Sequence, residues 1–99
     1  MLNSKQKIAL RKIAHTGNLV KFNIGKNNID KNVLATIEHG LVAYELIKVA
    51  FLKSALEGKS FEELVLDISG GVHADIVQEI GHTVILYRPN PKLKNPLKF

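Results

Sequence analysis

Apolar residues along this chain alternate between the spacing typical of helices and the spacing typical of strands. Around Leu10 and Ile13 they recur at helical spacing, whereas Phe22 and Ile24 alternate with polar residues, as in a half-buried strand. In chain order we predict a helix that ends at Gly17, a strand over 20–24, a helix from Asp30 to about Ala43, a strand over 45–52, a loop over 53–59, a helix from Ser60 to Gly70-Gly71, and strands over 72–80 and 83–88. This αβαβαββ order predicts an α+β fold, an α/β sandwich with a four-stranded mixed sheet that helices cover on at least one side.

The connections between these elements predict how the strands pair. Each strand–helix–strand unit is expected to join parallel neighbouring strands by a right-handed crossover. The last two strands are separated only by Gly81-His82, which fits a two-residue turn with glycine at its first central position. They are therefore expected to form an antiparallel hairpin, which makes the sheet mixed.

Short polar side chains mark the expected starts of the helices. Asn3 or Ser4 is suited to cap the first helix, and Gln6 occupies the reciprocal position of a capping box if Asn3 is the cap. Asp30 is suited to cap the second helix, and Ser60 opens a capping-box pattern for the third.

The chain has the size of one domain. We predict that residues 1–90 form this domain and that residues 91–99 are a basic, proline-containing tail that is ordered only if it docks. The absence of cysteine excludes disulfides and thiolate metal sites and suits a reducing compartment. No apolar run has the length of a membrane span, and no apolar stretch follows the first lysines as in a signal peptide. We therefore expect a cytoplasmic protein with no membrane partner.

Charge is distributed unevenly along the sequence. Residues 1–29 contain six basic and no acidic residues, residues 30–79 contain all nine acidic residues against four basic ones, and residues 80–99 contain four basic and no acidic residues. This asymmetry suggests that both ends of the chain contribute to one surface that faces an anion. Solubility without a specific partner remains an alternative explanation.

Residue patterns that carry catalysis are missing from the sequence. The four histidines, His15, His39, His73 and His82, lack metal-ligand spacing, and no serine stands in a GxSxG turn. Neither a Walker-type loop nor a GxGxxG sequence is present. We expect no enzyme, no metal and no cofactor.

The loop after the first predicted strand is the clearest candidate for binding phosphate. Gly25, Lys26, Asn27 and Asn28 lead directly into a helix, whose first backbone N–H groups and partial positive charge favour a phosphate. A GxxG loop of this kind holds the nucleic-acid backbone in KH domains, although the last position here is asparagine. A plain strand-to-helix turn is the alternative, and the capping carboxylate of Asp30 counts in its favour.

Other candidate residues lie outside this loop. Lys48 can contribute to an RNA site or simply point outward from a solvated strand, and Arg88 with the basic tail can extend the basic surface. Base stacking has little support, because Phe22, Phe51 and Phe61 fall on predicted core faces and Tyr44 and Tyr87 are ambiguous. Binding of nucleic acid would therefore depend on phosphate and shape contacts.

An ordered set of short segments resembles the CRM domain (chloroplast RNA splicing and ribosome maturation) in its stand-alone bacterial YhbY-like form. The resemblance covers roughly residues 2–90. The segments are Lys5-Gln6-Lys7, Leu10-Arg11, Ala14-His15, Ile24-Gly25-Lys26-Asn27, Glu45-Leu46-Ile47-Lys48-Val49, Val77-Gln78, Ile80-Gly81 and Val84-Ile85-Leu86-Tyr87-Arg88.

The resemblance implies a fold similar to the C-terminal domain of translation initiation factor 3. It also implies RNA binding without catalysis and association with precursor ribosomal particles, mainly of the large subunit. The GxxG-type loop of the family falls on Gly25, Lys26, Asn27 and Asn28, where Asn28 departs from the usual glycine. The basic first helix of the family falls on Lys5, Lys7, Arg11, Lys12 and His15.

The charge pattern and the resemblance together predict one RNA-binding surface and a monomer that binds ribosomal RNA. We expect the first helix, Lys21 and the Gly25–Asn28 loop to lie close together, because they follow one another in the sequence. The alternative is a protein-interaction module whose basic ends dock on acidic ribosomal or assembly proteins.

Overall fold

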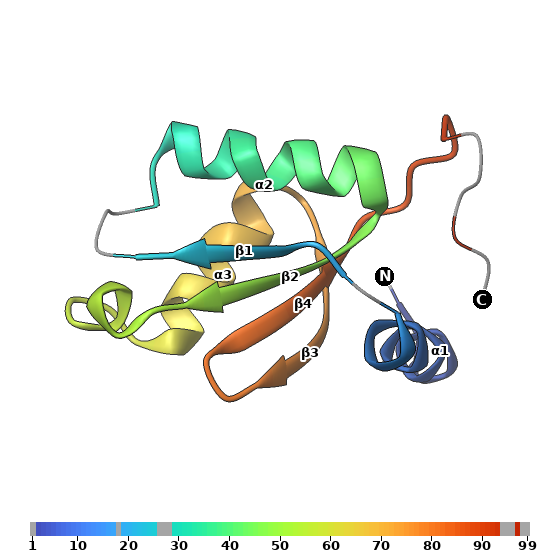
Figure 1. Cartoon of the computed structure of the whole chain (residues 1–99), viewed down its shortest axis with the longest axis horizontal. Helices are drawn as coiled ribbons and strands as arrows, with labels where there is room; N and C mark the ends of the chain where they lie inside the picture. Colours follow the sequence, from blue (N-terminus) through green and yellow to red (C-terminus); the bar gives the residue numbers. More distant parts are fainter. Residues whose placement is uncertain (1, 18, 26–28, 94–96, 98–99) are drawn as a thin grey trace.

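The computed structural model in Figure 1 describes residues 2–17, 19–25, 29–93 and 97. Within them the chain forms three α-helices, one short 3-10 helix and one four-stranded sheet. In order they are α1 (Ser4–Thr16), β1 (Lys21–Ile24), α2 (Lys31–Tyr44), β2 (Leu46–Phe51), η1 (Lys53–Leu56), α3 (Phe61–Gly71), β3 (Asp75–Ile80) and β4 (Thr83–Tyr87). The predicted α+β fold and αβαβαββ order are confirmed; η1 lies within a segment that was predicted to be a loop.

Each α-helix starts at a predicted capping residue. The Asn3 side chain accepts a hydrogen bond from the backbone N–H of Gln6, whose own side chain accepts one from the Asn3 N–H, and this completes the capping box. Asp30 accepts from the N–H of Val33, and Ser60 accepts from the third residue of α3 in the same way. Such caps satisfy backbone donors that the helix itself leaves free.

The strands lie in the order β1-β2-β4-β3. β1 and β2 are parallel, as predicted for the first strand–helix–strand unit, and β4 is antiparallel to both of its neighbours. The expectation of parallel neighbours was wrong for the second unit, because β4 lies between β2 and β3. Gly81 adopts a positive φ of 57°, which suits the first central position of the predicted two-residue turn between β3 and β4.

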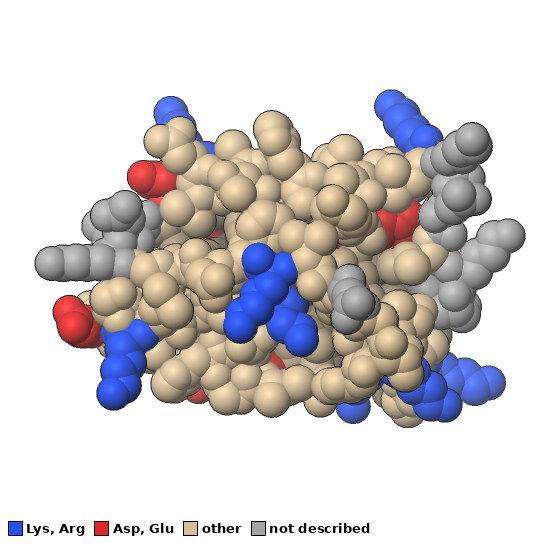
Figure 2. All heavy atoms as spheres, in the orientation of Figure 1, with Lys and Arg blue, Asp and Glu red and all other residues tan. Residues whose placement is uncertain are grey.

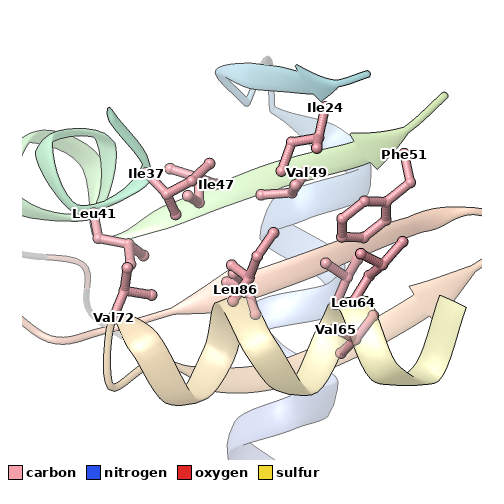
Figure 3. Close-up of a cluster of buried hydrophobic side chains, with 12 residues drawn as sticks. Ile24, Ile37, Leu41, Ile47, Val49, Phe51, Leu64, Val65, Val72 and Leu86 are labelled. Atoms are coloured by element: carbon pink, nitrogen blue, oxygen red, sulfur yellow. The ribbon is translucent and has the colours of Figure 1, made fainter. Parts of the chain in front are cut away.

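The main hydrophobic core lies between the sheet and the helices α2 and α3 (Figure 3). From β2 it contains Ile47, Val49 and Phe51, alternate residues that share one face of the strand. α2 contributes Ile37 and Leu41. Figure 3 shows side chains from the strands and from both helices pointing into one space, so that these helices and the sheet form two packed layers.

A second core cluster lies on the opposite face of the sheet, where α1 packs (Figure 1). Leu10 and Ala14 of α1 are buried there against residues of three strands: Leu46, Val77, Ile85 and Tyr87. A register shift between Ile76 and Gln78 of β3 marks a bulge at Val77. The bulge lets two successive residues meet α1, since Val77 packs in the cluster and Gln78 bonds to His15.

Several element boundaries differ from the prediction for local reasons. β2 starts at Leu46 because Glu45 alone turns the chain out of α2, with a positive φ of 63°. β3 was predicted to start at 72, but α3 continues to Gly71, Val72 caps it, and His73 takes a positive φ of 53°. The Asn90 side chain, just before the predicted tail, donates to the carbonyl of Val42, and Leu97 of the tail packs against the second core cluster.

Candidate nucleic-acid interface

Most basic residues of α1 lie outside the stripe that packs on the sheet, whereas Lys7, three residues before Leu10, borders that stripe. Leu10 and Ala14 anchor the stripe in the second core cluster. Of the predicted site residues on this helix, one is half-buried and the others are exposed: Lys5, Lys7, Arg11, Lys12 and His15. The amphipathic pattern of α1 therefore leaves Lys5, Arg11, Lys12 and His15 exposed to solvent.

One register row connects the sheet to these cations. Lys21 of β1 lies opposite Lys48 of β2, Lys48 lies opposite Ile85 of β4, and Ile85 lies opposite Gln78 of β3. Neighbouring residues in such a row point to the same face of a sheet. This face is the one on which α1 packs, because Ile85 belongs to the second core cluster. Lys21 and Lys48 are thus adjacent cations on the α1 side of the sheet.

A hydrogen bond joins this row to the basic helix. His15 Nε2 lies 3.0 Å from the side-chain oxygen of Gln78. Arg11 and Lys12, four and three residues before His15, are its neighbours on the helix surface. The row therefore connects Lys21 and Lys48 to α1 by way of Ile85, which α1 covers, and of Gln78, which bonds to His15.

We define the basic surface as the seven residues Lys5, Lys7, Arg11, Lys12, His15, Lys21 and Lys48. The elements that carry it, α1, β1 and β2, contain no acidic residue. Figure 2 shows Lys and Arg side chains over β1 and β2 near the centre of this face and over α1 at its lower right. With no carboxylate on these elements to neutralise it, the basic surface attracts anions.

Gly25 follows β1 directly at the end of the sheet. Its φ lies outside the left-handed region, and a Cβ added to it would meet Leu52 Cδ1 and Ser54 Oγ at 3.7 Å, an ordinary contact distance. Neither backbone conformation nor packing therefore requires glycine here. The other predicted residues of this loop, Lys26, Asn27 and Asn28, lie outside the described residues.

The structure does not bring Arg88 to the basic surface. Its guanidinium donates to Glu38 of α2 at 3.0 Å and to the carbonyl of Val72 at 2.9 Å, on the side of the sheet that α2 and α3 cover. These contacts join the end of β4 to the helices. The interaction with Glu38, 50 positions away, has no local signal in the sequence.

The tyrosines differ in their environments. Tyr87 is buried in the second core cluster, and its burial, followed by the charges of Glu45 and Asp75, raises the pKa of its hydroxyl group. It is therefore a core residue of the described structure. Tyr44 is 54% exposed at the end of α2, beside a small apolar hollow that also contacts Ile13 and Val20.

The described part of the chain shows neither a metal-binding cluster nor a membrane-spanning helix. Among these residues no group of three or more His, Asp or Glu side chains is placed to hold a metal ion. None of the described helices has the length and apolar character needed to cross a membrane.

Helices cover both faces of the sheet, and Lys21 and Lys48 lie beside α1 on one of them. Lysine and arginine side chains gathered on one side of a domain are typical of surfaces that bind nucleic-acid phosphates. The family model of the CRS1 / YhbY (CRM) domain matches residues 2–88 of this chain. The chain belongs to this family, as the resemblance predicted, and the match covers α1 and the whole sheet.

Similar proteins are named for RNA binding. One is "Probable RNA-binding protein YqeI" of Bacillus subtilis, 35% identical over 94 residues, which cover 95% of each chain. Another is "RNA-binding protein" of Haemophilus influenzae, 39% identical over 94 residues that cover 94% of this chain and 91% of the relative. A solved structure is also similar: the solution structure of the hypothetical protein SAV1595 from Staphylococcus aureus, which is described as a candidate RNA binding protein. The two structures superimpose with a TM-score of 0.71 and are 36% identical in sequence. The match covers 96% of this chain and 95% of that one.

Proposed function

We propose that this protein binds RNA through the basic surface and the Gly25–Asn28 loop, and that it assists ribosome assembly by binding precursor large-subunit ribosomal RNA. The observation that carries the proposal is that Lys21 and Lys48 are adjacent on the face of the sheet on which the basic helix α1 packs. The names of the relatives support RNA as the ligand. The ribosomal target follows from the family resemblance. In this proposal the protein acts in the cytoplasm as a monomer, without catalysis or a cofactor.

The proposed mechanism is electrostatic. Lysine and arginine side chains neutralise RNA phosphates and release the counterions that had condensed on them. Because none of the seven residues of the basic surface is a phenylalanine, tyrosine or tryptophan, base stacking contributes little there. Affinity is then set by the number of phosphates contacted, and RNA shape decides how many can be reached at once.

The salt dependence of binding tests this mechanism. If five to seven phosphates are contacted, the slope of log K against log salt is expected to be roughly −4 to −6. A filter-binding titration of ribosomal RNA fragments over a range of salt concentrations gives this slope. A flat response would contradict the electrostatic mechanism.

A cellular experiment tests the ribosomal target. RNA crosslinked to the protein in cells is expected to consist mainly of precursor large-subunit ribosomal RNA when the fragments are sequenced. A parallel pull-down with and without nuclease separates RNA from protein partners. Partners that survive nuclease treatment, together with an absence of crosslinked ribosomal RNA, would favour docking on an acidic protein instead.

Gly25→Ala separates the two interpretations of the loop. The added methyl group fits at 3.7 Å from its neighbours, so the free energy of unfolding is expected to change by less than about 1 kcal/mol. If a phosphodiester approaches the Gly25 backbone, RNA affinity falls severalfold, since a Cβ holds the phosphate away. Urea unfolding and RNA titration of the same variant measure both quantities. Unchanged affinity would identify the loop as a plain strand-to-helix turn.

A further inference from the structure

A cavity of about 330 Å³ lies between β1 and α2, next to Gly25. Its apolar lining comes from the side chains of Phe22, Val33 and Ile37, and Asn32 and Thr36 of α2 add polar groups. This size and this mixture are typical of sites that enclose a small, mostly apolar ligand and fix its orientation with a few hydrogen bonds.

The open edge of the sheet forms one side of this cavity. β1 is an edge strand, and the carbonyls of Val20 and Ile24 accept hydrogen bonds from Lys48 and Leu52 at the β2 side. Successive residues of a strand direct their backbone groups to alternate sides. Asn23, which also lines the cavity, therefore presents its N–H and C=O to the edge that no described strand occupies.

The polar groups of α2 remain able to bond a ligand. The Thr36 hydroxyl donates to the carbonyl of Asn32 at 3.0 Å, which leaves its oxygen free to accept. Apolar walls, with a backbone donor and acceptor on one side and a hydroxyl on the other, fit a flat ring with polar atoms around its rim. A nucleobase has this form, and its pairing edge is available only when the base is unpaired.

The basic surface begins on the other side of the same strand. Lys21 lies on the α1 face of β1, opposite Lys48, whereas Phe22, the next residue, lines the cavity. A strand of RNA that crosses β1 can therefore leave phosphates on the lysines and place a base on the α2 side. A duplex cannot follow this path, because its bases are paired and stacked inside it.

We infer that the cavity between β1 and α2 receives one unpaired nucleobase, so that the protein binds a single-stranded RNA segment across β1. This inference rests on the proposed RNA-binding function and extends it by defining the form of RNA that is bound. Binding of the base differs from the electrostatic contacts in its expected salt dependence, because a base in an apolar cavity releases no counterions.

Thr36→Leu tests the inference by filling the cavity. Thr36 is an exposed residue of α2, and leucine favours helix more than threonine, so the fold is expected to be retained. Thr36→Met, with a more flexible side chain, is a second cavity-filling variant. The matched control is Ala35→Leu, which adds the same side chain at the adjacent exposed position, outside the cavity lining.

The measurements are titrations with a short single-stranded RNA of mixed sequence and with the duplex that it forms with its complement. Thr36→Leu and Thr36→Met are expected to weaken single-strand binding by about tenfold, the effect of losing roughly 1.4 kcal/mol of base contact. Their salt slope and duplex binding should equal those of the wild type, and Ala35→Leu should change nothing. If the cavity-filling variants bind the single strand like the wild type, the inference is wrong while the proposed function stands. If the wild-type protein binds neither RNA, the proposed function itself fails.

Discussion

Replacing Lys21 and Lys48 together by glutamine is expected to lower RNA affinity about 25-fold at about 0.1 M salt. Each lysine that neutralises a phosphate of a single strand contributes a salt slope of about −0.7, which amounts to about fivefold in affinity at that concentration. The two positions are opposite one another in the parallel pairing of β1 and β2, so both cations face the same stretch of RNA. Glutamine retains much of each side-chain stem while it removes the charge.

The same titration gives a second readout. The slope of log K against log salt should become flatter by about 1.4 in the double variant. The matched control is the double variant Lys59→Gln with Lys92→Gln, which changes the net charge by the same amount at exposed positions outside the basic surface. Of these two lysines, Lys59 pairs with Asp67 of α3 at 2.9 Å. If this control lowers affinity as much as the double variant, overall charge rather than the row across the sheet determines binding.

Leu10→Ala is expected to give the largest loss of stability among changes in α1, about 3 kcal/mol. Leu10 is completely buried in the second core cluster, and alanine would leave a cavity between α1 and the sheet. Domains have a total free energy of unfolding of roughly 5–15 kcal/mol, so this loss is a large fraction of it. Urea denaturation measures the change in the free energy of unfolding.

Ile8→Ala is the matched control on the same helix. Ile8 is 51% exposed, so its truncation should cost less than about 1 kcal/mol. The Leu10→Ala variant should also bind RNA more weakly at temperatures where it is folded, because a loosened α1 no longer holds Arg11 and Lys12 beside the sheet. Equal stabilities of the two variants would show that α1 is not anchored by this cluster.

The sequence predicted those parts of the fold that depend on neighbouring residues. The caps at Asn3, Asp30 and Ser60 were predictable because each side chain bonds a backbone group three residues further along. The position of β4 between β2 and β3 was not predictable, since the rules for hairpins and crossovers allow either β3 or β4 to lie next to β2. The bulge at Val77 was also not predictable, because an alternating pattern of apolar and polar residues does not show where a strand has one more residue than its partner.

The same distinction applies to the candidate site. The exposure of Lys5, Arg11, Lys12 and His15 on α1 follows from helical spacing relative to Leu10 and Ala14. That Lys21 and Lys48 are adjacent depends on strand register, which pairs residues 27 positions apart. Arg88 carried the same charge signal in the sequence, yet its partner Glu38 comes from a distant helix. Composition therefore indicates how many cations are available, whereas only the topology decides which of them share a face.

The central place of β4 has a consequence for how the protein is made. β4 comes last in sequence among the described strands, and both β2 and β3 pair with it along its length. During translation neither strand has this partner until β4 has left the exit tunnel, so until then the nascent chain exposes unpaired strand edges and apolar side chains. Folding of the whole sheet therefore waits for β4, and chains interrupted before β4 are expected to be substrates for chaperones and proteases.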